Sequence, residues 1–358
     1  MATPSAAATA AKPPSTPKLG VRILGSGSAV PSRVVSNDQI ASLCGSDNEW
    51  IIQRTGIHER RVCDPAKGES NAALCTQALR RALEAAKVAP TELDLVICGT
   101  ITQDMRCPST ACLVASELGC GTTAAWDLGA ACCGFVYSLN TAHDLIKAGT
   151  FKTVGVIGAD TVSAITDYTN RNVAILFGDA AGAVVLRATD DASKGVVAQS
   201  NHANGNGWQE LFVPGWDSHI KEGADRALVK TGCLHMNGRE VFKFAVTTFC
   251  QLIQETLDKA GLQASDVDMF VCHQSNVRII DAAVERFGIA KDKVYVNIDR
   301  FGNTSAGSVP LCFDELRRAA HSGRSVGDVH RLRRRLDVVG QPVAHVIVSA
   351  LDAASLSH

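Results

Sequence analysis

The chain has 358 residues, of which 46% are hydrophobic and 20% charged, a composition typical of a globular protein with a sizeable core rather than a disordered one. The formal net charge is −1, so the basic excess of most nucleic-acid-binding domains is missing, and no apolar run reaches the roughly 18–20 residues that span a membrane. Thirteen cysteines without a signal peptide favour a cytoplasmic protein with buried or catalytic thiols over a disulfide framework.

The first segment is too poor in large apolar residues to form a core. Residues 1–18 are mainly alanine, proline, serine and threonine, and we expect a disordered tail there. From Gly20 the sequence predicts a short strand that ends in a tight turn at the Gly-Ser-Gly-Ser segment 25–28. This segment lacks the Gly-Lys-Ser/Thr ending of a phosphate-binding loop.

Beyond this strand, apolar segments with helical spacing alternate with short apolar runs, which predicts an α/β fold. The expected helices are 72–87, 108–118 and 134–148, and the expected strands are 93–98, 124–128, 153–158, 173–177 and 182–186.

The chain also contains an internal repeat. Segments 82–100 and 256–274 share one pattern, in which Leu83 recurs as Leu257 and Cys98 as Cys272, each 174 residues later. The Gly-Ala-Ala-Cys-Cys-Gly segment 129–134 lies roughly where 300–307 lies in the second copy. We therefore expect two copies of one α/β unit, an N-terminal half over 19–190 and a C-terminal half over 191–328.

A pair of cysteines, Cys132 and Cys133, follows an expected strand and precedes an expected helix. A thiol at a helix N-terminus faces unpaired N–H groups and the positive end of the helix dipole, both of which favour the thiolate. One of the pair is therefore a candidate nucleophile. Adjacent cysteines also occur in metal sites and vicinal disulfides, but no second Cys/His group with ligand spacing accompanies them.

Two further polar residues lie at comparable turns. His273 follows the apolar run 268–272, and Asn303 lies in a Gly/Ser-rich turn before the next expected helix. Taken singly, the histidine is typical of a structural residue and the asparagine of a cap or turn residue. A duplicated unit can bring these turns together with the cysteine, which makes the combination a candidate catalytic site.

At this point the sequence resembles a known family, β-ketoacyl-acyl-carrier-protein synthase III, which has the duplicated thiolase-like fold with five layers, α-β-α-β-α. The resemblance runs from about Gly20 to Asp328. The segments that carry it are 48–57, 130–132, 177–182, 236–242, 273–276 and 302–305.

The resemblance implies an acyltransferase that initiates fatty acid synthesis, with Cys132, His273 and Asn303 as its catalytic triad. Cys132 would take an acyl group from acyl-CoA, and the other two would donate hydrogen bonds to the thioester oxygen of malonyl-acyl carrier protein as it loses carbon dioxide. A related enzyme that loads a polyketide or quinolone starter is an alternative, and so is a catalytically impaired paralogue.

The resemblance also implies ligand contacts and an assembly. Coenzyme A would be a substrate bound by Trp50, Arg54, Gly238 and Asn276, and the acidic carrier protein would dock on Lys243 and Arg278. A homodimer is expected, with no cofactor, metal, nucleic acid or membrane among its partners.

Three features depart from the family pattern. Ala164 stands where the family often has an arginine near the nucleotide, and Cys107 where it commonly has a bulky apolar residue that reaches into the partner's acyl pocket. The third departure is the C-terminus, where the family has a strand and a glycine-rich loop whose N–H completes the oxyanion hole.

Here the C-terminal segment 329–358 is atypical, because four arginines stand among residues 331–336, a pattern unsuited to a buried strand. Read one nucleotide out of frame, codons for residues 331–344 permit Ala-Phe-Gly-Gly-Gly-Leu-Thr-Trp, which has the missing glycine loop. We therefore hypothesise a shift of reading frame near Val329.

Overall fold

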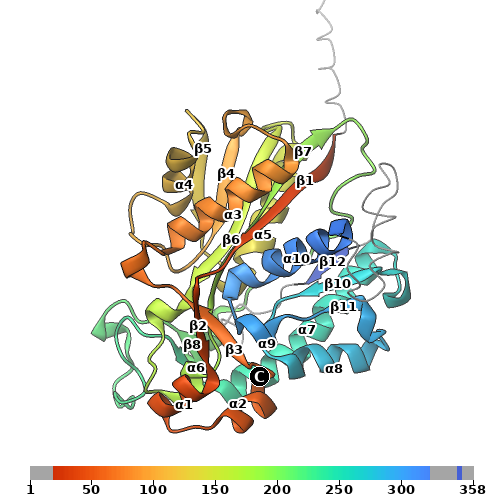
Figure 1. Cartoon of the computed structure of the whole chain (residues 1–358). Coiled ribbons are helices and arrows are strands. Elements are labelled where there is room, and N and C mark those ends of the chain that lie inside the picture. The colour runs from red at the N-terminus through yellow and green to blue at the C-terminus, as the bar shows by residue number, and fades with distance from the viewer. Residues whose placement is uncertain (1–18, 323–344, 349–358) are drawn as a thin grey trace, which may run out of the picture.

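The computed structural model describes residues 19–322 and 345–348, which form two main sheets with helices outside and between them (Figure 1). The first sheet has the strand order β1-β7-β6-β4-β5 and the second the order β11-β10-β12. The strands are β1 (Gly20–Ala29), β4 (Leu95–Gly99), β5 (Ala124–Leu128), β6 (Thr153–Thr161), β7 (Asp179–Thr189), β10 (Met269–Cys272), β11 (Val294–Tyr295) and β12 (His345–Val348).

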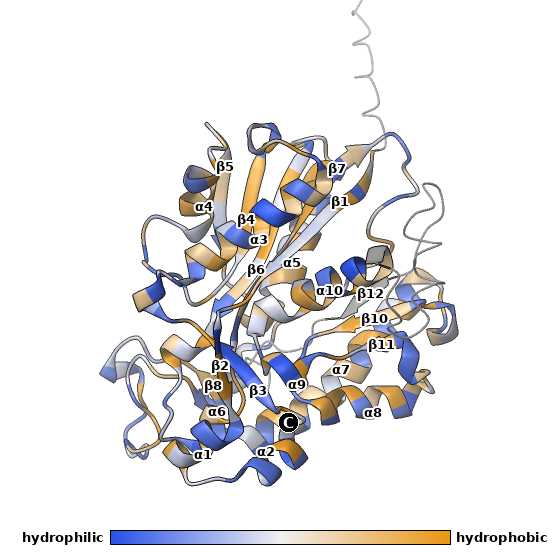
Figure 2. Cartoon of the chain, viewed as in Figure 1, coloured by the Kyte–Doolittle hydropathy of each residue, from blue (hydrophilic) through white to orange (hydrophobic). Residues whose placement is uncertain are grey.

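The packing of the helices creates five layers. Helices α3 (Asn71–Ala86) and α4 (Thr110–Leu118) cover the outer face of the first sheet. Helices α5 (Gly134–Lys147) and α10 (Ser308–Ser322) pack against both sheets and so lie between them. Helices α7 (Gly238–Ala260) and α8 (Val277–Phe287) cover the second sheet from outside. The expected α-β-α-β-α order is therefore confirmed, and Figure 2 shows its central strands β4 and β6 as strongly apolar.

The internal repeat is confirmed element by element. Helix α3 ends at Ala86 and α7 at Ala260, and β4 begins at Leu95 and β10 at Met269, so both pairs keep the offset of 174 residues. The loops between them are capped in the same way. The Glu92 carboxylate accepts the N–H of residue 89 at 2.9 Å, and the Asp266 carboxylate accepts that of residue 263 at 2.9 Å.

Smaller elements form the end of the molecule drawn at the bottom of Figure 1. They are β2 (Arg33–Ser36), α1 (Asn37–Cys44), α2 (Asn48–Thr55), β3 (Glu59–Val62), α6 (Arg171–Ala174), β8 (Leu211–Phe212), β9 (His235–Met236) and α9 (Ile298–Phe301). The predicted strand 173–177 is wrong, because its first residues belong to α6, which the Asn170 side chain caps. Val173 and Ala174 are buried on this short helix, and within the segment only Phe177 makes a β-bridge, with Asn303.

The turn predicted at 25–28 is also wrong, because β1 continues through it to Ala29. Its glycines serve close packing instead. A Cβ on Gly25 would lie 2.3 Å from the backbone oxygen of Ala82, and one on Gly27 would lie 2.4 Å from that of Ala78. Helix α3 thus lies directly on this strand, and glycine is required there for contact rather than for chain reversal.

We expect Gly25→Ala to destabilise the fold by about 1–3 kcal/mol, since backbone atoms must move to admit the methyl group. Gly205→Ala is the matched control, because a Cβ there would meet nothing within 4 Å. Urea unfolding of both variants measures the difference. Equal midpoints for the two would show that α3 does not depend on this contact.

Candidate active site

Cys132 lies in a strained turn at the N-terminus of α5. The turn is a single 3₁₀ turn, η3 (Ala131–Cys133), and Ala131 has the left-handed φ of 42°, which is uncommon for a residue with a side chain. The predicted position at a helix N-terminus is therefore confirmed. Cys133 is buried at 1% exposure, whereas Cys132 is half-buried and packs against the core of the C-terminal half.

The equivalent turn of the second copy contacts this one. It is η9 (Ser305–Gly307), and Ser305, 174 residues after Ala131, has a similarly left-handed φ of 49°. The Ser305 hydroxyl oxygen lies 3.4 Å from Cys132 Sγ, and the Ser305 N–H donates to Asn303 Oδ1 at 2.9 Å. Ser305 thus contacts both Cys132 and Asn303. Ser305 was not singled out from the sequence, although the repeat offset points to it.

The backbone of Asn303 is fixed on both sides by the segment before β7. Its N–H donates to the Leu176 oxygen at 2.8 Å, and its carbonyl accepts the N–H of Gly178 at 3.1 Å. Gly302 makes the approach possible, because it has a φ of 65° and a Cβ there would lie 2.7 Å from the Leu176 oxygen. With Oδ1 already accepting a backbone N–H, the amide group of Asn303 offers its Nδ2 hydrogens as donors.

His273 lies directly after β10 and is only 3% exposed. Its Nδ1 is 2.6 Å from Ser308 Oγ, and its Nε2 has no hydrogen-bond partner within the described residues. Burial lowers the pKa of His273 to about 4, because desolvation disfavours the charged ring. The imidazole is therefore neutral at pH 7.

This pKa predicts how stability varies with pH. The unfolded chain binds a proton at His273 near pH 6.5, whereas the folded chain binds it only near pH 4, so acid favours unfolding across that window. We expect wild type to lose about 3 kcal/mol more stability between pH 7 and pH 4 than His273→Gln does. Denaturant titrations at each pH test this; parallel curves would contradict the depressed pKa.

Behind the two turns lies a buried carboxyl, Asp160, at the end of β6. Its oxygens accept hydrogen bonds from Thr100, Ile101, Thr102 and the N–H of Ala306 at 2.8–3.2 Å. Complete burial raises the pKa of this carboxyl, and its hydrogen bonds oppose that rise. Asp160 thus anchors the turn after Asn303 to the first sheet. No spacing in the sequence marked it.

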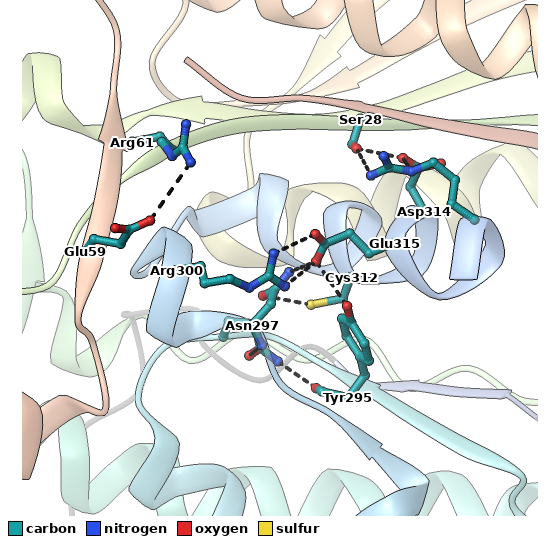
Figure 3. Close-up of polar contacts among 11 residues, drawn as sticks. Ser28, Glu59, Arg61, Tyr295, Asn297, Arg300, Cys312, Asp314 and Glu315 are labelled. Carbon is teal, nitrogen blue, oxygen red and sulfur yellow. Dashed lines mark hydrogen bonds and ion pairs between the residues drawn. The ribbon is translucent and has the colours of Figure 1, made fainter. Parts of the chain in front are cut away.

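A second anchor lies beyond His273. Figure 3 shows the Glu315 carboxylate of α10 accepting hydrogen bonds from the side chains of Arg300, Asn297 and Tyr295. The two hydrogen bonds from Arg300 are each 2.9 Å long. The Asn297 N–H in turn donates to the side chain of Gln274, the residue after His273, at 3.1 Å. These bonds hold the end of β10 against the helix that carries Ser308.

The residues expected to bind a nucleotide lie together at α2 and the start of α8. Asn276 caps α8, and its Nδ2 donates to the Arg54 oxygen at 3.0 Å. The Trp50 ring lies 5.6 Å from the Arg54 guanidinium and 4.8 Å from that of Arg171. Arg171 was not expected from the sequence. It supplies a cation beside this ring, whereas Ala164, which stands where the family often has an arginine, does not.

The residues expected to meet a carrier protein lie nearby on two helices. Lys243 of α7 and Arg278 of α8 are both exposed, and the Arg278 guanidinium lies 5.1 Å from the ring of Phe242. Gly238 is the first residue of α7. The structure therefore gathers these positive charges on neighbouring surfaces beside the expected nucleotide residues.

Family models match both halves of the chain. The model for 3-oxoacyl-[acyl-carrier-protein] synthase III matches residues 126–205, and the model for its C-terminal part matches residues 257–326. A β-ketoacyl-[acyl-carrier-protein] synthase III from Desulfitobacterium hafniense strain Y51 is 45% identical over 87% of this chain and 92% of its own length. The chain belongs to the 3-oxoacyl-[acyl-carrier-protein] synthase III family.

Solved structures agree with this assignment. The synthase III of Aquifex aeolicus VF5 is 39% identical, with a TM-score of 0.76, and the alignment covers 86% of this chain and 92% of that one. The priming β-ketosynthase of the R1128 polyketide pathway is 36% identical, also with a TM-score of 0.76, over 84% of this chain and 88% of that one. The thiolase-like fold and the condensing acyltransferase activity expected from the sequence are thereby confirmed.

Other expectations for this synthase III concern its thiols and surfaces. All 13 cysteines lie in the described part of the chain and none of them forms a disulfide, and Cys107 is exposed. Across residues 19–322 and 345–348, no His, Cys, Asp and Glu side chains cluster in a way that could hold a metal ion. Within the same residues, no helix is long and apolar enough to cross a membrane.

Proposed function

We propose that this synthase III uses Cys132 to take an acyl group from acyl-CoA and condenses it with malonyl-acyl carrier protein. The thiolate attacks the acyl-CoA carbonyl, the bond between that carbonyl and the coenzyme A sulfur breaks, and coenzyme A leaves as its thiolate, which takes up a proton from water. The malonyl group then loses carbon dioxide, its carbanion attacks the acyl-cysteine, and a 3-oxoacyl-acyl carrier protein is released with the thiolate restored. The observation that carries the proposal is the contact of the Cys132 turn with the Asn303 turn through Ser305. His273 is assigned to the same site by family resemblance, and its buried, neutral imidazole suits that role.

His273 and Asn303 suit the decarboxylation step. As carbon dioxide leaves, negative charge develops on the malonyl thioester oxygen, and two buried donors aimed at that oxygen stabilise it. Asn303 offers Nδ2, and a neutral His273 offers Nε2–H without placing a permanent charge in the site. We assign decarboxylation to these two side chains and acyl transfer to Cys132, so that variants can separate the steps.

We propose that coenzyme A binds where Trp50, Arg54 and Asn276 meet, with Gly238 lining the path of the pantetheine arm. The indole supplies a stacking face for adenine, and the guanidinium groups of Arg54 and Arg171 supply charge for phosphates. Lys243 and Arg278 are the proposed docking charges for the acidic carrier protein.

Trp50→Ala should raise the KM for acyl-CoA roughly 5- to 100-fold, the range expected for losing one base–aromatic stack, with kcat little changed. Trp208→Ala is the matched control, since this exposed tryptophan packs on Phe212 instead. Steady-state kinetics with varied acyl-CoA measures both. An unchanged KM in Trp50→Ala would place the nucleotide elsewhere.

A second candidate function is the loading of a polyketide starter, which the likeness to the R1128 priming ketosynthase favours. The two functions differ in the acyl-CoA that they accept. Condensation with malonyl-acyl carrier protein, measured across short, long and branched acyl-CoAs, separates them. Preference for acetyl-CoA supports fatty acid initiation, and preference for a longer or unusual starter supports the second function.

We propose that the enzyme is a cytoplasmic homodimer. Strand β5 is the edge of the first sheet, and all five of its residues are only half-buried, as expected for an edge that another strand can cover. Cys107, which stands where the family commonly has a bulky apolar residue that reaches into the partner's acyl pocket, is exposed in this chain.

We further propose that the tail after Asp328 results from a shift of reading frame. The C-terminal family model matches only to residue 326, and most of the segment 329–358 lies outside the described residues. The exception is β12, which pairs in parallel with β10. Codons for these positions, read one nucleotide out of frame, permit the glycine loop of the family, so the present chain is a candidate impaired form of the enzyme.

A further inference from the structure

A buried serine, Ser308, contacts one ring nitrogen of His273, Nδ1. Ser308 is the first residue of α10 and is 1% exposed. We propose that Ser308 is a positioning residue, whose hydroxyl donates to His273 Nδ1 and so keeps the ring proton on Nε2. The inference deepens the proposed function, because it rests on the role of His273 as a donor to the malonyl thioester.

The hydrogen-bond geometry gives the direction of this bond. Ser308 Oγ lies 2.6 Å from His273 Nδ1 and also accepts the Gln274 N–H at 3.4 Å. This hydroxyl makes no other hydrogen bond among the described residues, so its one proton has Nδ1 as its acceptor. If Nδ1 carried the proton instead, the buried hydroxyl would have no acceptor, which is costly.

The other ring nitrogen of His273, Nε2, is the one that can donate a hydrogen bond to a substrate. Nε2 of His273 is buried and has no partner in the described part of the chain, so its proton is available to a substrate. A neutral imidazole has one N–H, and its place on one nitrogen is set by the hydrogen bond at the other. With Nδ1 accepting from Ser308, Nε2 is the donor that the decarboxylation step needs.

The internal repeat supplies an independent comparison. The positions 174 residues before His273 and Ser308 are Gly99 and Gly134, at the end of β4 and the start of α5. A Cβ on Gly99 would lie 2.3 Å from the Gly134 carbonyl carbon, so the first copy makes the same contact with backbone alone. The fold therefore needs no side chains where the end of the strand meets the start of the helix. In the second copy, the hydrogen-bonded side chains of His273 and Ser308 occupy this place.

The tautomer can be read directly by NMR on the full chain labelled with ¹⁵N-histidine. Long-range ¹H–¹⁵N correlations distinguish a protonated from an unprotonated ring nitrogen, and the His273 signals are those absent from His273→Gln. We expect a neutral ring with the proton on Nε2 in wild type. A ring with its proton on Nδ1 overturns the proposal. This readout does not depend on turnover. A failure of the tautomer proposal can therefore be told apart from a failure of the proposed function, which would appear as no acylation of Cys132.

Kinetics test the consequence. We expect Ser308→Ala to slow decarboxylation of malonyl-acyl carrier protein about tenfold, the order expected for one buried hydrogen bond, while acylation by acetyl-CoA changes less than about twofold. Ser308→Thr, which keeps the hydroxyl, should recover most of the rate. The matched control is Ser138→Ala, which removes a buried hydroxyl that has no hydrogen-bond partner in the described structure.

The outcomes separate positioning from a merely structural role. Selective loss of decarboxylation in Ser308→Ala, with both steps intact in Ser138→Ala and rescue by threonine, supports the proposal. Equal loss of both steps, or of thermal stability and both rates together, shows that Ser308 only supports the fold and overturns it. An unchanged decarboxylation rate in Ser308→Ala also overturns it.

Discussion

Replacing Cys132 by alanine should lower the rate of condensation by a factor on the order of 10⁴ or more, because the covalent intermediate can no longer form. Decarboxylation of malonyl-acyl carrier protein should persist in this variant, since His273 and Asn303 are untouched. The two activities are measured separately, as release of carbon dioxide and as formation of 3-oxoacyl-acyl carrier protein.

Cys133→Ala is the matched control for this substitution. It removes the adjacent thiol, which is only 1% exposed. We expect both steps to survive in this variant apart from a modest loss of stability. Loss of condensation in Cys133→Ala with retention in Cys132→Ala would exchange the proposed roles of the two cysteines.

Restoring the reading frame after about Val329 should raise the rate of condensation about 10²–10³-fold. That is the usual effect of a single oxyanion-hole donor, and the restored sequence contains the glycine loop that supplies one in the family. The comparison is between this chain and a variant encoding Ala-Phe-Gly-Gly-Gly-Leu-Thr-Trp in place of the arginine-rich segment.

The gain should appear in the acyl transfer step, where the tetrahedral intermediate forms, and little in the affinity for acyl-CoA. Sequencing the gene across this region provides the independent check. An unbroken frame that encodes the arginine-rich segment, together with equal rates for the two proteins, would contradict the frameshift proposal.

The layer order and the repeat could be predicted because they depend on local patterns. Strand β5 was predicted without error at 124–128, and the caps at Glu92 and Asp266 recur at one offset because each closes the same short loop. The glycines of β1 were misread because glycine is equally suited to turns and to close packing. Only the position of α3 above Gly25 and Gly27 decides between these uses.

The same limit applies to the site. The three turns and the family resemblance suggested the proposed triad, but the residues that contact its turns could not be predicted. Asp160 lies on β6, Ser305 is an ordinary serine in a turn, and Arg171 reaches Trp50 from a short helix far along the chain. These contacts arise from the packing of separate elements, and no spacing in the sequence specifies such packing.

The most direct test of the central claim is to locate an acyl group on the protein after incubation with acetyl-CoA alone. Intact-mass measurement followed by peptide mapping identifies which of the 13 cysteines carries it. We expect a single acetyl group on Cys132 that is transferred when malonyl-acyl carrier protein is added. An acetyl group on another cysteine, or free coenzyme A released with no acyl-protein formed, would contradict the account.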